Sequence, residues 1–77
     1  MKERAVFVLT SQYSQFTHRV GDVDSLREII LGLSGDKAKA KRVASVAKNM
    51  QVGDGFSTPG ILLTYEREVE YPSTGGN

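Results

Sequence analysis

A long alternation of apolar and polar residues between Ile61 and Tyr71 constrains the fold of this chain more than any other feature. Because successive side chains of a β-strand point to opposite faces, this period of two predicts one long strand. One face would carry Ile61, Leu63, Tyr65, Val69 and Tyr71, interrupted by Arg67, and the other Leu62, Thr64, Glu66, Glu68 and Glu70. We expect the far half of this strand to extend beyond its sheet.

Two earlier segments are also typical of strands. Residues 5–10 are apolar on both faces, which is the pattern of a strand covered on both sides. Residues 16–20 alternate, with Phe16, His18 and Val20 on one face, and predict a half-buried strand. A hairpin through residues 11–15 would join the two strands.

Residues 22–33 are typical of an amphipathic helix that packs on the sheet. Its apolar stripe, at i, i+3, i+4 and i+7, consists of Leu26, Ile29, Ile30 and Leu33. Ser25 and Glu28 have the spacing of a capping box at the start of this helix. Asp22 and Asp24 are alternative caps.

A second helix follows closely in the sequence. Gly32 and Gly35 are positions at which the first helix can stop in a left-handed conformation. Ser34 or Asp36 can then cap a helix that runs to about Met50. Its apolar arc on a helical wheel consists of Ala40, Val43, Val46, Ala47 and Met50.

The order of these elements predicts the fold class. Residues 53–60 contain three glycines and Pro59, and we expect a loop there. The resulting order β-β-α-α-β indicates an α+β fold, a small antiparallel sheet of about three strands with two helices packed on one face. We expect a single domain over residues 1–72 and a flexible tail over residues 73–77.

Composition excludes several classes of protein. The 77 residues contain no cysteine, which excludes a disulfide framework, a thiolate nucleophile and a cysteine zinc site. The longest apolar run near the start, residues 5–9, is shorter than the about seven residues of a signal peptide or the about twenty of a membrane span. We therefore expect a cytoplasmic protein without a membrane partner or a cofactor.

Two helices cover only one face of a sheet, and this leaves several apolar residues without a partner. These residues are Val6, Val8, Leu31 and Leu62. Leaving each in water forgoes roughly 1.5 to 3 kcal/mol of burial. We therefore predict a small non-enzymatic binding protein, of a regulatory or inhibitor type, that contacts a protein partner and associates with itself through its sheet. Its charged rim would be Glu66, Glu68 and Glu70.

That interpretation has a simpler alternative. Single exposed apolar side chains, here Leu31 and Leu62, are normal on protein surfaces. The tail, or residues 11–15, could fold over Val6 and Val8 instead of a partner.

The second predicted helix is strongly basic and suggests a different function. Residues 37–50 carry five positive charges and no negative ones, although the formal net charge of the chain is only +1. Lys37, Lys41 and Lys48 lie within about 40° of one another on a helical wheel. Nucleic-acid binding through Lys37, Lys41, Arg42 and Lys48 is therefore an alternative function. No aromatic residue is interleaved with these cations, as stacking on single strands would require.

The remaining motifs are weak. His18 is the only histidine, and its position between Phe16 and Val20 favours a partly buried structural imidazole over a catalytic one. In residues 53–60, Gly55 and Gly60 have the glycine spacing of a phosphate-binding loop. The next two residues are Ile61 and Leu62, whereas that motif requires Lys followed by Ser or Thr, so the sequence does not match it. A small-anion or nucleotide site made by backbone N–H groups of this loop is a second alternative. We predict no catalytic residue and no metal ligand.

Overall fold

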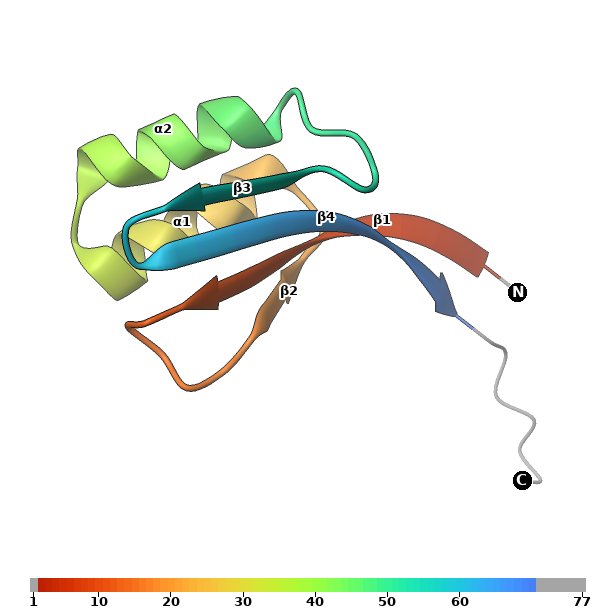
Figure 1. The fold of residues 1–77 in the computed structure, drawn as a ribbon, viewed down its shortest axis with the longest axis horizontal. Coiled ribbons are helices and arrows are strands. Elements are labelled where there is room, and N and C mark those ends of the chain that lie inside the picture. Colours follow the sequence, from red (N-terminus) through yellow and green to blue (C-terminus); the bar gives the residue numbers. More distant parts are fainter. Residues whose placement is uncertain (1, 71–77) are drawn as a thin grey trace.

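The computed structural model describes residues 2–70, which form one antiparallel sheet and two helices (Figure 1). The elements are β1 (Lys2–Ser11), β2 (His18–Val20), α1 (Val23–Ser34), α2 (Lys37–Ala47), β3 (Gly55–Thr58) and β4 (Ile61–Glu70). The strand order is β2-β1-β4-β3, and both helices pack on the same face of the sheet. The α+β class and the two helices on one face are confirmed. The tail predicted for residues 73–77 lies outside the described residues.

The sheet has four strands where the sequence predicted about three. The expected loop over residues 53–60 contains β3, in which Gly55, Phe56, Ser57 and Thr58 pair with β4. The turn residues lie at the ends of this strand, since Gly53 and Gly60 have φ values of 100° and 84°. A four-residue strand with Gly and Ser on one face shows no apolar alternation, so only its pairing with β4 reveals it.

The central pair β1 and β4 is longer than the rest of the sheet. The two strands are in register over ten pairs, from Lys2 opposite Glu70 to Ser11 opposite Ile61. β2 pairs only with residues 7–9 of β1, and β3 only with residues 61–64 of β4. Residues 2–6 and 65–70 therefore form a two-stranded ribbon beyond the four-stranded part, as expected for the far half of β4 (Figure 1).

The caps of the helices follow the sequence only in part. α1 has Asp22 as its N-cap, without a side-chain cap hydrogen bond, and Ser25 lies inside the helix, so the predicted capping box was wrong. The helix ends as expected at Gly35, whose φ of 67° is left-handed and whose N–H donates to the carbonyl of Leu31. Asp36 caps α2 by accepting a hydrogen bond from the N–H of Lys39 at 3.0 Å.

The hydrophobic core lies between the sheet and the helices. The largest fully buried side chains are Leu9, Leu26, Ile30, Val43 and Leu63. On β1 and β4 the rings of Phe7 and Tyr65 stack with centroids 4.4 Å apart. Phe16 is not part of the core: it lies in the connection between β1 and β2 and is 72% exposed, so the predicted strand over residues 16–20 shortens to His18–Val20.

Candidate binding surfaces

No described helix packs on the sheet face opposite α1 and α2. Its side chains, from here on the open face, follow from the strand registers: Arg4, Val6, Val8 and Thr10 on β1, Arg19 on β2, Gly55 and Ser57 on β3, and Leu62, Thr64, Glu66 and Glu68 on β4. Its described charges balance, with two arginines against two glutamates. The open face is therefore a nearly neutral surface.

Val6 lies on the open face and yet is only 3% exposed. An ion-paired cluster explains this burial. Glu68 Oε1 lies 2.8 Å from the Arg4 guanidinium, and Glu68 Oε2 lies 3.5 Å from that of Arg19. Arg19 on β2 stands opposite Val8 of β1, and Glu68 on β4 stands opposite Arg4 of β1. The ion pair between Arg19 and Glu68 therefore crosses β1 near Val6, which lies between Arg4 and Val8 on the same face. The aliphatic parts of these long side chains can thus cover the valine.

Leu62 remains the main exposed apolar residue of the open face. It is 49% exposed, between Thr10 on β1 and Ser57 on β3, while Val8 is half-buried. A shallow depression of about 420 Å³ adjoins it at the end of the sheet. The residues lining this depression are Thr10, Ser11, Gln12, Ser57, Thr58, Gly60, Ile61 and Leu62. The direct neighbours of Leu62 on the adjacent strands thus have small polar side chains.

The glutamates predicted as a charged rim have different environments. Glu68 is held by the two arginines, with 27% of its side chain exposed. Glu66 is exposed and accepts a hydrogen bond from the hydroxyl of Thr64 at 2.7 Å. Glu70 ends β4, and its side chain lies outside the described part of the chain.

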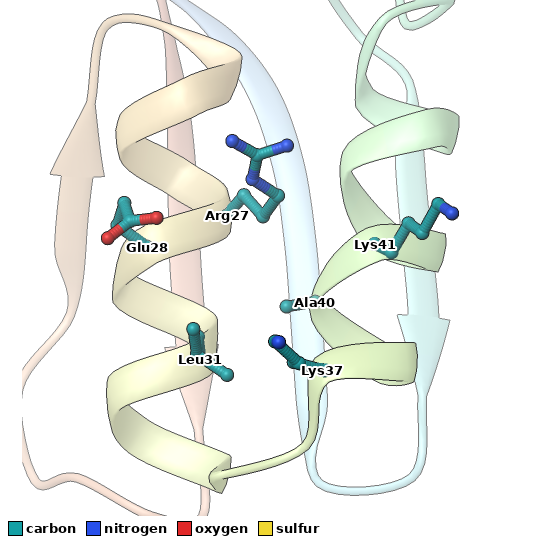
Figure 2. Close-up of a pocket in the computed structure, with 6 residues that line it drawn as sticks. All are labelled: Arg27, Glu28, Leu31, Lys37, Ala40 and Lys41. Carbon is teal, nitrogen blue, oxygen red and sulfur yellow. The ribbon is translucent and has the colours of Figure 1, made fainter.

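A groove of about 440 Å³ separates the two helices on the other side of the molecule (Figure 2). It is lined by Arg27, Glu28, Leu31, Lys37, Ala40 and Lys41. Figure 2 shows Arg27 and Lys37 reaching into the space between the helices from α1 and α2. Leu31 thus lies on the helix layer, where it packs partly buried against the core, and not with Val6, Val8 and Leu62 on the open face.

The predicted nucleic-acid residues separate into two sets on α2. Lys37 and Lys41 line the groove, and Lys48 falls near them on the helical wheel. Arg42 lies roughly 100° further round the helix from Lys41. Arg27 was missed by sequence reasoning because it belongs to a different helix. Its spacing of four residues from Leu31 is the signal that places both on one side of α1.

Lys39 has a structural role. Its ammonium group donates to the carbonyl oxygen of Pro59 at 2.8 Å and to the hydroxyl of Tyr13 at 3.2 Å. It also lies 5.6 Å from the centroid of the Tyr13 ring, within range of a cation–π interaction. Lys39 therefore connects the first turn of α2 to the two loops at this end of the sheet.

His18 stands opposite Leu9 at the edge of the sheet, on the face that the helices cover. It is half-buried, and its Nε2 atom is buried without a hydrogen-bond partner among the described residues. Within residues 2–70, no group of His, Cys, Asp and Glu is arranged to hold a metal ion.

Two backbone N–H groups at the start of residues 53–60 are hydrogen-bonded within the chain. The N–H of Gly53 donates to the carbonyl of Tyr65 at 2.9 Å, and the N–H of Asp54 to that of Gln51 at 2.8 Å. The carboxylate of Asp54 accepts the N–H of Gln51, which places a negative charge at this turn. These groups are not available to a small anion.

The described helices are too short and too polar to cross a membrane. Comparison of the chain with protein-family models, with curated proteins and with solved structures finds no match.

Proposed function

We propose that this chain is a non-enzymatic binding protein that acts through protein–protein contacts of its open face, with a second copy of the chain as the partner. The observation that carries the proposal is the 49% exposure of Leu62 in a sheet face that no described element covers. Burying the exposed half of Leu62 in both copies is favourable, by roughly 25 cal/mol per Å² of apolar surface.

Charge favours the open face over the helix layer as the surface for self-association. The described charges of the open face, Arg4, Arg19, Glu66 and Glu68, sum to zero. Residues 37–50 on the helix layer carry five cations and no anion. Two copies can approach through the neutral face without net repulsion, whereas like charges facing each other across an interface are costly.

The absence of aromatic rings from the open face supports a protein partner rather than single-stranded nucleic acid. Sheets that bind RNA stack bases on exposed aromatic side chains. Here Phe7 and Tyr65 stack on the opposite face, against the helices. Leu62 with its small neighbours Thr10 and Ser57 leaves room for a sheet-on-sheet contact, in which sheets pack about 10 Å apart.

Sedimentation equilibrium tests this proposal from about 10 µM to about 1 mM, the range of weak association. We expect dimers for the unchanged chain and monomers for Leu62→Glu, which places a charge in the contact. Val52→Glu is the matched control, because Val52 is also 49% exposed but lies in the connection between α2 and β3, outside the strands that form the open face. A monomer at all concentrations, or equal effects of the two substitutions, would refute the proposal.

A further inference from the structure

The groove between α1 and α2 gathers more positive than negative charge. Arg27 comes from α1, and Lys37 and Lys41 come from successive turns of α2. Glu28 is the one acidic residue in the lining, and the carboxylate nearest to Arg27, that of Asp24, lies 3.9 Å away. The groove therefore has a net positive charge.

The lysines on this side of α2 have no partners in the described part of the chain. Lys37, Lys41 and Lys48 make no ion pair and no side-chain hydrogen bond within residues 2–70. Lys39 provides the contrast, since it is bound to Pro59 and Tyr13. The cations left for an external ligand are thus Lys37 and Lys41, which line the groove, and Lys48 at the end of α2.

The spacing of these cations fits an extended anion. From Lys37 to Lys48 the helix rises by roughly 16 Å, at about 1.5 Å per residue. A small phosphate would instead use the N-terminus of α2, where free N–H groups converge. There the Asp36 carboxylate already accepts the N–H of Lys39. A row of phosphates matches the arrangement better than a single one.

The surroundings of the groove favour a duplex over a single strand. Single-strand sites combine cations with aromatic rings on which bases stack. The groove lining contains no aromatic residue, and its apolar members are the aliphatic Leu31 and Ala40. Lysines held in a row by a rigid helix suit the fixed positions of the phosphates along a duplex backbone.

We propose that the groove between α1 and α2, lined by Arg27, Lys37 and Lys41, binds the phosphate backbone of duplex DNA without sequence specificity, together with Lys48 at the C-terminal end of α2. This goes beyond the proposed contact through the open face. The groove lies on the opposite side of the sheet, so a dimer formed through the open faces leaves both grooves outward.

Fluorescence anisotropy with a labelled duplex of mixed sequence tests the proposal across a salt series. Four phosphate contacts predict that log K falls with log salt concentration with a slope of about −3.6. In the triple variant Lys37→Gln, Lys41→Gln, Lys48→Gln only the contact of Arg27 remains, so the slope should be about −0.9. At about 0.1 M salt, each lost contact weakens binding about eightfold on the same relation. The Leu62→Glu variant, which should not dimerise, should keep the full salt dependence of duplex binding per copy. Loss of self-association and loss of duplex binding are therefore measured separately.

Neighbouring residues on α2 provide the matched control. Lys41→Gln and Arg42→Gln change the net charge equally, but only Lys41 lines the groove. We expect a clear loss of affinity for Lys41→Gln and a smaller one for Arg42→Gln. Circular dichroism should show the same fold for all variants, because these side chains are exposed. No binding to the duplex at low salt, tighter binding to a length-matched single strand, or equal losses for the two single variants would overturn the proposal.

Discussion

Replacing Val6 with alanine tests whether charged side chains bury an apolar residue on the open face. Val6 is 3% exposed and Leu62 is 49% exposed on the same face. If the cluster of Arg4, Arg19 and Glu68 covers Val6 as the ion-pair geometry indicates, Val6→Ala opens a cavity although no helix packs there.

The expected magnitude follows from the groups removed. Val6→Ala deletes two methyl groups, worth about 0.8 kcal/mol each when buried, and incomplete collapse of the cavity raises the cost to about 2 kcal/mol. Leu62→Ala deletes more carbon atoms, but half of the side chain is already in water. Its cost to the free energy of unfolding should be about 1 kcal/mol or less. Val6→Ala is thus predicted to lower the free energy of unfolding more than Leu62→Ala, although valine is the smaller side chain.

Urea unfolding followed by circular dichroism measures both costs, at a protein concentration low enough to avoid self-association. A double-mutant cycle with Glu68→Gln adds a direct test of the cover. We expect Glu68→Gln alone to cost about 0.5 to 1 kcal/mol, because its ion pairs are partly exposed. In the Val6→Ala background, Glu68→Gln should lower the free energy of unfolding by about 0.5 kcal/mol less than it does in the unchanged chain. A cost of Val6→Ala below that of Leu62→Ala, or no coupling, would refute the reasoning.

Two further substitutions test local features of the fold by thermal or urea unfolding. Asp36→Ala removes the cap of α2 and should lower the free energy of unfolding by about 1 kcal/mol, while Asp36→Asn retains an acceptor and most of the stability. An unchanged stability of the alanine variant would contradict the cap. His18→Leu replaces a side chain whose buried Nε2 has no partner among the described residues, and should raise stability by about 1 kcal/mol. A clear destabilisation would show that the imidazole is bound after all.

Local patterns predicted the elements whose signals lie within one segment. The alternation after Ile61 marks β4, because each position reports which face of a strand is buried. Gly35 ends α1 and Asp36 starts α2 for reasons of backbone conformation and hydrogen bonding that need no distant residue. β3 could not be predicted in this way, since it is a strand only because β4 offers it a partner.

The candidate surfaces depend more on long-range contacts. The lysines of α2 were visible in the sequence, but Arg27 joins Lys37 and Lys41 only because the two helices pack side by side. The sequence likewise left Val6 without a cover, whereas the structure buries it and pairs Arg19 with Glu68 across β1, two residues far apart along the chain. The same packing places Leu31 in the groove, on the opposite side of the sheet from Leu62.

The sequence by itself therefore determined the class of fold, most strand and helix positions, and the segregation of positive charge into α2. These properties follow from periodicity and local backbone preferences. Only the tertiary structure decided the fourth strand, the neutral open face and the combination of cations along the groove. They depend on strand register and helix packing, which bring together side chains that no local pattern relates.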